Sequence, residues 1–175
     1  GADITLTCQE NSKPIDGSSS TSGAGITYTW DGPGINGNNF NQQNPMVADS
    51  GLYVVTVTNT ANSCTASDAV YVALDADYPL TEAGPDRTIN CIADTVQLDG
   101  SMSATGPGIT MEWSGGSIVQ GEQFGMTPRV YAPAQYILTV TNANNGCSNT
   151  DFVNVEEDVF APIADAGADQ VITCS

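Results

Sequence analysis

The spacing of the cysteines limits the folds open to this chain more than any other feature of its sequence. The chain has five of them, at Cys8, Cys64, Cys91, Cys147 and Cys174. One constant shift along the sequence carries Cys8 onto Cys91, Cys64 onto Cys147 and Cys91 onto Cys174, and we call this shift the repeat period. The same shift aligns Trp30 with Trp113 and Tyr53 with Tyr136 without a gap. The sequence is therefore a tandem repeat, and we expect the fold to be built from copies of one unit.

The period divides the chain into two predicted domains, residues 1–83 and 84–166. The remaining residues, 167–175, restate the opening of the repeat, and we interpret them as the first strand of a third copy. A segment this short cannot fold by itself. We therefore expect the chain to be a piece of a longer array.

Within each repeat the pattern is that of β-strands. Runs rich in β-branched and aromatic residues alternate with polar ones over residues 26–30, 52–57 and 69–74. Asp, Asn, Gly and Pro fill the gaps between them, as in turns. No segment has helical spacing with caps. We expect an all-β fold in which each repeat is a sandwich of about seven short strands.

The charge balance and composition exclude several kinds of function. The chain has 20 acidic residues, 3 basic residues and no histidine, which gives a formal net charge of −17. Nucleic-acid binding requires a basic surface that three bases cannot form. No apolar run is long enough for a membrane-spanning helix. Catalysis is not expected, because there is no histidine base and the acids shared by the repeats fall in turns and linkers.

Several segments resemble immunoglobulin-like repeats. Residues 49–53, Asp-Ser-Gly-Leu-Tyr, are similar to the entry into strand F of an immunoglobulin fold, and Trp30 and Trp113 stand where such folds place a core tryptophan. Residues 164–174 and 136–142 resemble PKD-like repeats of long surface proteins of Bacteroidota. The resemblance covers nearly the whole chain. It implies tandem immunoglobulin-like (PKD-like) β-sandwiches.

The resemblance implies a structural role outside the cell. We expect a segment of a cell-surface stalk, adhesin or filament whose partners are neighbouring repeats or neighbouring chains. The alternative is a carbohydrate-binding or adhesive module of a secreted protein, with a surface glycan or a protein as its partner. Glycan binding would need several exposed, coplanar rings in one repeat, and the sequence shows no such platform.

Two disulfide arrangements respect the repeat. One joins Cys8 to Cys64 and Cys91 to Cys147, each within a repeat. The other joins Cys64 to Cys91 across the linker, but an extended strand after Cys64 would carry the chain roughly 30 Å away from it. We expect the first arrangement, in which the bridge ties the first strand to the last. It would leave Cys174 without a partner in this chain, and reduced or other pairings stay open.

Acidic residues gather between the repeats and suggest calcium. Three positions recur at the repeat period: Asp75 with Asp158, Glu82 with Asp165, and Asp86 with Asp169. Asp77 adds a further carboxylate to the first linker. Carboxylates from a linker and the adjoining domains are ligands that Ca²⁺ prefers. The alternative is a solvated acidic linker that keeps the protein soluble.

Two smaller sites complete the candidates. Asp94-Thr95-Val96 resembles an O-glycosylation signal of Bacteroidota, which makes Thr95 a candidate acceptor unless it simply begins a strand. Asp16 and Asp99 each precede Gly and Ser. We interpret both as turn residues in preference to metal ligands.

Overall fold

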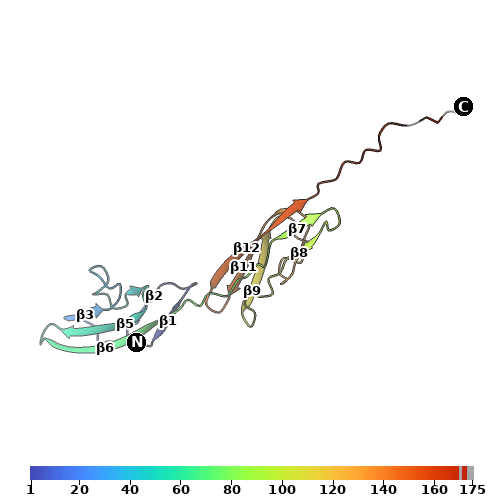
Figure 1. Cartoon of the computed structure of the whole chain (residues 1–175). Coiled ribbons are helices and arrows are strands. Elements are labelled where there is room, and N and C mark those ends of the chain that lie inside the picture. Colours follow the sequence, from blue (N-terminus) through green and yellow to red (C-terminus); the bar gives the residue numbers. More distant parts are fainter. Residues whose placement is uncertain (170, 173–175) are drawn as a thin grey trace. The chain divides into compact units, whose positions relative to one another are not determined.

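The structure, a computed structural model, describes residues 1–169, 171 and 172 and contains only β-strands in that part of the chain. Figure 1 shows the chain, with all of its strands except β4 and β10 labelled. The first repeat contains β1 (Ile4–Thr7), β2 (Lys13–Pro14), β3 (Ile26–Asp31), β4 (Met46–Val47), β5 (Gly51–Asn59) and β6 (Cys64–Asp75). The second contains β7 (Arg87–Asn90), β8 (Val96–Gln97), β9 (Ile109–Gly115), β10 (Arg129–Val130), β11 (Ala134–Asn142) and β12 (Cys147–Asp158). The all-β prediction is confirmed, with six named strands per repeat.

Every strand of the second set begins one repeat period after its counterpart in the first. The sheets repeat in the same way. A four-stranded sheet has the order β1-β6-β5-β3 in the first repeat and β7-β12-β11-β9 in the second. A two-stranded sheet accompanies each, β2-β4 and β8-β10. The sequence period is therefore a period of structure.

One strand pair in each repeat is parallel. β1 pairs with β6 so that Thr7 lies opposite Asp75, the last residue of β6. β7 pairs with β12 in the same sense, with Asn90 opposite Asp158. β5 pairs with both β3 and β6 in the antiparallel sense. The end of the first strand in each repeat therefore lies at the end of the last strand, not at its beginning.

The core of the first repeat draws side chains from both of its sheets. Leu6, Trp30, Tyr53, Val55, Val70 and Val72 come from the four-stranded sheet, Val47 comes from β4, and Ile15 directly follows β2. The second repeat buries the equivalent residues, Ile89, Leu98, Trp113, Val130, Tyr136, Leu138, Val153 and Val155. Two sheets that enclose one apolar core make a β-sandwich.

The shared tryptophans and tyrosines are core residues, as expected. Trp30 donates its indole N–H to the carbonyl oxygen of Gln42 at 2.9 Å. The Tyr53 hydroxyl donates to the carbonyl oxygen of Asp49, four residues upstream, at 2.7 Å. Tyr136 makes the equivalent bond to Ala132 at 2.8 Å. These are tyrosine corners of the immunoglobulin type. Burial, followed by the nearby Asp49 carboxylate, raises the pKa of Tyr53.

Asp16 and Asp99 form turns, which confirms that interpretation. Each carboxylate accepts the backbone N–H two residues later, from Ser18 at 2.8 Å and from Ser101 at 3.1 Å. Hydrogen bonds from these serines lower the pKa of both carboxyl groups. The oxygen atoms are therefore engaged within the turn.

The chain separates into two compact units whose limits differ from those of the repeats. Unit 1 comprises Gly1–Thr81, Ser103–Met111 and Thr139–Thr150. Unit 2 comprises Glu82–Met102, Glu112–Leu138 and the chain from Asp151 onward. Unit 1 thus contains the first repeat up to Thr81 together with two segments of the second. Among the described residues there is no helix with the length and apolar character needed to cross a membrane.

Candidate functional site

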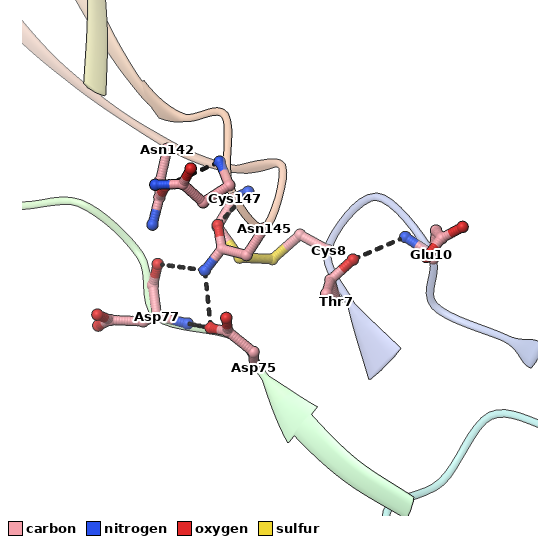
Figure 2. Close-up of a disulfide and its surroundings, with 9 residues drawn as sticks. Thr7, Cys8, Glu10, Asp75, Asp77, Asn142, Asn145 and Cys147 are labelled. Carbon is pink, nitrogen blue, oxygen red and sulfur yellow. Dashed lines mark hydrogen bonds between the residues drawn. A yellow bond between two sulfur atoms is a disulfide. The ribbon is translucent and has the colours of Figure 1, made fainter. Parts of the chain in front are cut away.

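The feature that distinguishes this chain is a disulfide between its repeats. Cys8 follows β1, and Cys147 begins β12. Their sulfur atoms are bonded, with the Cα atoms 5.0 Å apart and a sequence separation of 139 residues. Both cysteines belong to unit 1. Figure 2 shows the bridge and the polar residues around it.

The expected pairing within each repeat is wrong. Cys64 and Cys91 are free and exposed in the structure. Cys8 follows Thr7, which lies opposite the last residue of β6, whereas Cys64 is the first residue of the same 12-residue strand. The two ends of such a strand lie roughly 36 Å apart, far beyond the reach of a disulfide. Parallel pairing of the first and last strands therefore forbids a bridge within a repeat.

Asn145 is the polar centre of this site. Its side chain is almost completely buried, at 1% exposure. The amide nitrogen donates to Asp75 Oδ1 at 2.8 Å and to the carbonyl oxygen of Asp77 at 3.1 Å (Figure 2). The amide oxygen accepts the N–H of Cys147 at 2.9 Å. One side chain thus links the end of β6 to the loop that carries the bridging cysteine.

The backbones on the two sides of the bridge also approach closely. The N–H of Gln9 donates to the carbonyl oxygen of Asn145 at 3.2 Å. Gly146 has φ 72°, and a Cβ atom placed on it would lie 2.5 Å from Cβ of Gln9. A side chain at this position would therefore be strained by its backbone conformation and would collide with the facing loop.

The linker after β6 makes the third set of contacts. The carbonyl oxygen of Leu80 accepts the N–H of Ala104 at 2.9 Å, and that of Pro79 accepts Asn149 Nδ2 at 3.5 Å. In unit 2, Ala83 donates its N–H to Asp151 at 2.8 Å. Pro79, Thr81 and Ala83 alternate as buried residues along this segment. The linker residues up to Thr81 are therefore packed within unit 1, and Ala83 is packed within unit 2.

Sequence reasoning missed Asn145 and Gly146. One signal in the sequence could have indicated Asn145. Asn62 and Asn145 are one repeat period apart, and each stands two residues before a cysteine. In the first repeat Asn62 Oδ1 likewise accepts the N–H of Cys64, at 3.0 Å, although Asn62 is exposed. The loop geometry is therefore intrinsic to the repeat, and the burial of Asn145 comes from its contacts in unit 1.

The acidic residues predicted to bind calcium are dispersed. Asp75 and Asp77 belong to unit 1, and Glu82 and Asp86 belong to unit 2. Asp75 bonds to Asn145, and Asp86 accepts the N–H of Asn154 at 2.8 Å. The remaining three acids are exposed; they are Asp158, Asp165 and Asp169. Within the described residues no group of three His, Cys, Asp or Glu side chains is placed to hold a metal ion. Calcium stays a prediction from the sequence.

The remaining predicted sites are Thr95 and the first strand of a third repeat. Thr95 is exposed just before β8 and donates its hydroxyl to Asp94 Oδ1 at 3.2 Å. Its glycosylation stays a prediction. In the predicted first strand of a third repeat, 167–175, Cys174 and residues 170, 173 and 175 lie outside the described residues. The described residues from 159 onward form no strand.

No protein-family model matches the chain. The chain is 31% identical over 185 aligned residues to the mouse dyslexia-associated protein KIAA0319 homolog, which covers 89% of this chain and 17% of that protein. The chain thus spans about a sixth of that relative.

Solved structures with a similar arrangement have low sequence identity. A PKD domain from human KIAA0319 is 17% identical, with a TM-score of 0.36 over 52% of this chain and 90% of that one. Drosophila N-cadherin EC1-4 is 14% identical, with a TM-score of 0.39 over 90% of this chain and 47% of that one. The sandwich cores and tyrosine corners described above define the fold class. The fold is PKD-like and immunoglobulin-like.

The repeat offers a matched pair of variants for the polar centre. We expect Asn145→Ala to lower the free energy of unfolding by roughly 2–3 kcal/mol, because it leaves the N–H of the buried Cys147 without a partner and removes the two hydrogen bonds to Asp75 and Asp77. Asn62→Ala removes the equivalent exposed side chain and should cost at most about 0.5–1 kcal/mol. Urea denaturation of both variants measures the difference. Equal losses would show that Asn145 makes no special contribution.

Proposed function

We propose that the chain is a structural segment of a long extracellular tandem-repeat protein. It would serve as part of a stalk, an adhesin extender or a filament, as in the Bacteroidota-type surface proteins that its sequence resembles. The observation that carries this proposal is the Cys8–Cys147 disulfide, which joins residues of two successive repeats. A covalent bond between repeats serves a protein that must hold its domains together under load.

The chemistry of the chain supports a location outside the cytoplasm. Disulfides form and persist in oxidising compartments and are rare in the cytosol. A formal net charge of −17 favours solubility and opposes nonspecific association of a long surface molecule. The partners in this proposal are neighbouring repeats of the same protein or neighbouring chains. No catalytic role is part of it.

The competing function is glycan or protein adhesion by the repeats themselves. Tyr71 on β6 lies opposite Leu52 on β5, and both side chains are more than half exposed. This pair is the part of the first repeat best suited to stack against a sugar ring. It is one aromatic residue, whereas a sugar-binding platform requires several.

A glycan array separates the two functions. We expect the full chain to show no saturable binding to any immobilised glycan, with Tyr71→Ala indistinguishable from wild type. Saturable binding that disappears in Tyr71→Ala would contradict the structural proposal and favour the module. Circular dichroism of the variant verifies that the sandwich remains folded, since Tyr71 is exposed and outside the core.

A further inference from the structure

The exposed Cys64 is one of the residues that line a hollow in the first repeat. The hollow has a volume of about 450 Å³. Its lining includes Thr21, Ile26, Val57, Cys64, Ala66 and Asp68. Both polar and apolar atoms face it, and the free Cys64 is part of its lining. We call the hollow and its lining residues the acceptor end.

In the second repeat the equivalent residues are in contact with the linker. Thr21 corresponds to Ala104, which donates its N–H to the carbonyl oxygen of Leu80. Ala66 corresponds to Asn149, which donates to the carbonyl oxygen of Pro79. Cys64 corresponds to Cys147, which is fully buried and bonded to Cys8. One occupant of this kind of hollow is therefore visible in the structure: a repeat's linker together with the cysteine loop after its first strand.

The same occupant is present, and exposed, elsewhere in the chain. Cys91 follows β7 as Cys8 follows β1, and it is free. Residues 159–166 follow β12 as the linker follows β6, and they include Pro162 and Ile163 at the positions of Pro79 and Leu80. Ile163 is 95% exposed and Ile92, beside Cys91, is 97% exposed. We call Cys91, Ile92, Asp158 and residues 159–166 the donor end.

We propose that the donor end of one molecule docks on the acceptor end of a second copy and that Cys91 then forms a disulfide with Cys64 of that copy. The partner is a second copy because each end carries the counterpart of one half of a junction already formed at Cys8 and Cys147. In a longer array the same pairing would join each repeat to the next. The inference goes beyond the proposed function, since it assigns a partner to Cys64 and Cys91, the two free cysteines among the described residues.

Both loops already have the conformation that the junction requires. The N–H of Ser63 donates to the carbonyl oxygen of Asn59 at 2.8 Å, as Gly146 does to Asn142 at 2.8 Å. On the donor end, the N–H of Asn90 donates to the carbonyl oxygen of Ala93 at 2.9 Å, as Thr7 does to Glu10 at 3.1 Å. The hydrogen-bonded turn of each cysteine loop is therefore already formed before docking.

The equivalence also predicts the polar contact at the new junction. Asn62 is exposed, and it occupies the position of Asn145. Its amide nitrogen would donate to Asp158 of the other copy, which occupies the position of Asp75. One residue departs from the pattern. Ser63 stands where the formed junction has Gly146, and there a Cβ atom would lie 2.5 Å from the facing loop. Ser63 therefore weakens the docking.

The covalent step needs an oxidant. The Cys91 thiol and the Cys64 thiol together lose two protons and two electrons as the sulfur–sulfur bond forms. A small-molecule disulfide such as oxidised glutathione accepts the electrons and is released as two thiols. The reaction proceeds through a mixed disulfide at one of the two exposed cysteines.

The test uses the full chain with Cys174→Ser, which removes the third thiol. Two further variants, Cys64→Ser and Cys91→Ser, are mixed in a glutathione redox buffer near ~150 mM salt, where surface repulsion between acidic molecules is screened. Docked thiols react at a raised effective concentration, so the Cys91–Cys64 dimer should outnumber either symmetric dimer by roughly tenfold. Non-reducing electrophoresis and peptide mapping count the products. Symmetric and mixed dimers in random proportion would overturn the proposal.

Three single changes test the geometry of docking. Ser63→Gly removes the obstructing Cβ atom and should increase the yield of mixed dimer. Asp158→Ala removes the acceptor for Asn62 and should reduce that yield by roughly tenfold, the loss expected for a hydrogen bond to a charged group. Glu157→Ala is the matched control, because it removes a neighbouring exposed acid with the same charge. Equal effects of Asp158→Ala and Glu157→Ala, or no gain from Ser63→Gly, would overturn the docking geometry.

Discussion

A single molecule pulled from its two ends should release roughly 480 Å less chain with the Cys8–Cys147 bridge intact than after reduction, since the bridge closes a loop of 139 residues. Tension that enters at the first residue reaches Cys8, crosses the sulfur–sulfur bond and leaves through Cys147. The residues between the two cysteines lie outside this path. With the bridge intact, only the segments outside it can be extended.

Optical tweezers with and without a phosphine reductant measure this difference directly. The double variant Cys8→Ser with Cys147→Ser should give the long extension without reductant. The double variant Cys64→Ser with Cys91→Ser is the matched control and should behave as wild type, because both of those cysteines are free. Full extension of the oxidised wild type would show that the bridge does not carry the load, and it would weaken the proposed structural role.

Much of the fold could be predicted from the sequence because each strand pattern occurs in both repeats. One repeat period superimposes the cysteines in the sequence and the strand starts in the structure. The alternation that marks strands at 26–30 and 52–57 also marks which side chains enter the core, as for Trp30 and Tyr53. Short strands of two residues, such as β2 and β4, carry too little alternation to be found in this way.

The disulfide could not be predicted because strand direction is not encoded in alternation. An alternating pattern shows which face of a strand is buried, and it is the same for parallel and antiparallel neighbours. Strand length excludes a bridge from Cys64 to Cys91, and the same length excludes Cys8 to Cys64 once β1 is known to run parallel to β6. The remaining pairing between successive repeats then follows from the period.

The burial of Asn145 could not be predicted from the sequence for a related reason. Asn62 and Asn145 occupy equivalent positions before a cysteine, and in sequence they have the same properties. The contacts with Asp75, Asp77 and Gln9 distinguish the buried Asn145 from the exposed Asn62. Structure inside a repeat can therefore be predicted from either copy. The contacts between repeats cannot, because they depend on which repeat adjoins the residue.

The second large effect is on stability. Replacing Cys8 and Cys147 by serine should lower the free energy of global unfolding by about 5 kcal/mol in the chain-entropy description, because the opened loop of 139 residues gives the unfolded chain more freedom. A further loss would come from the folded state, since Cys147 is fully buried and a serine hydroxyl there would need a hydrogen-bond partner. Equilibrium urea denaturation, monitored by tryptophan fluorescence, measures the change.

The repeat again supplies the control for this experiment. Serine at Cys64 and Cys91 makes the same chemical change at equivalent positions that are exposed and unbridged, so stability should change by no more than about 0.5 kcal/mol. Adding reductant to wild type should reproduce the loss seen for the bridge variant and leave that variant unchanged. A bridge variant as stable as the control would mean that unit 1 is held by Asn145, Gly146 and the packed linker alone, with the disulfide acting only under tension.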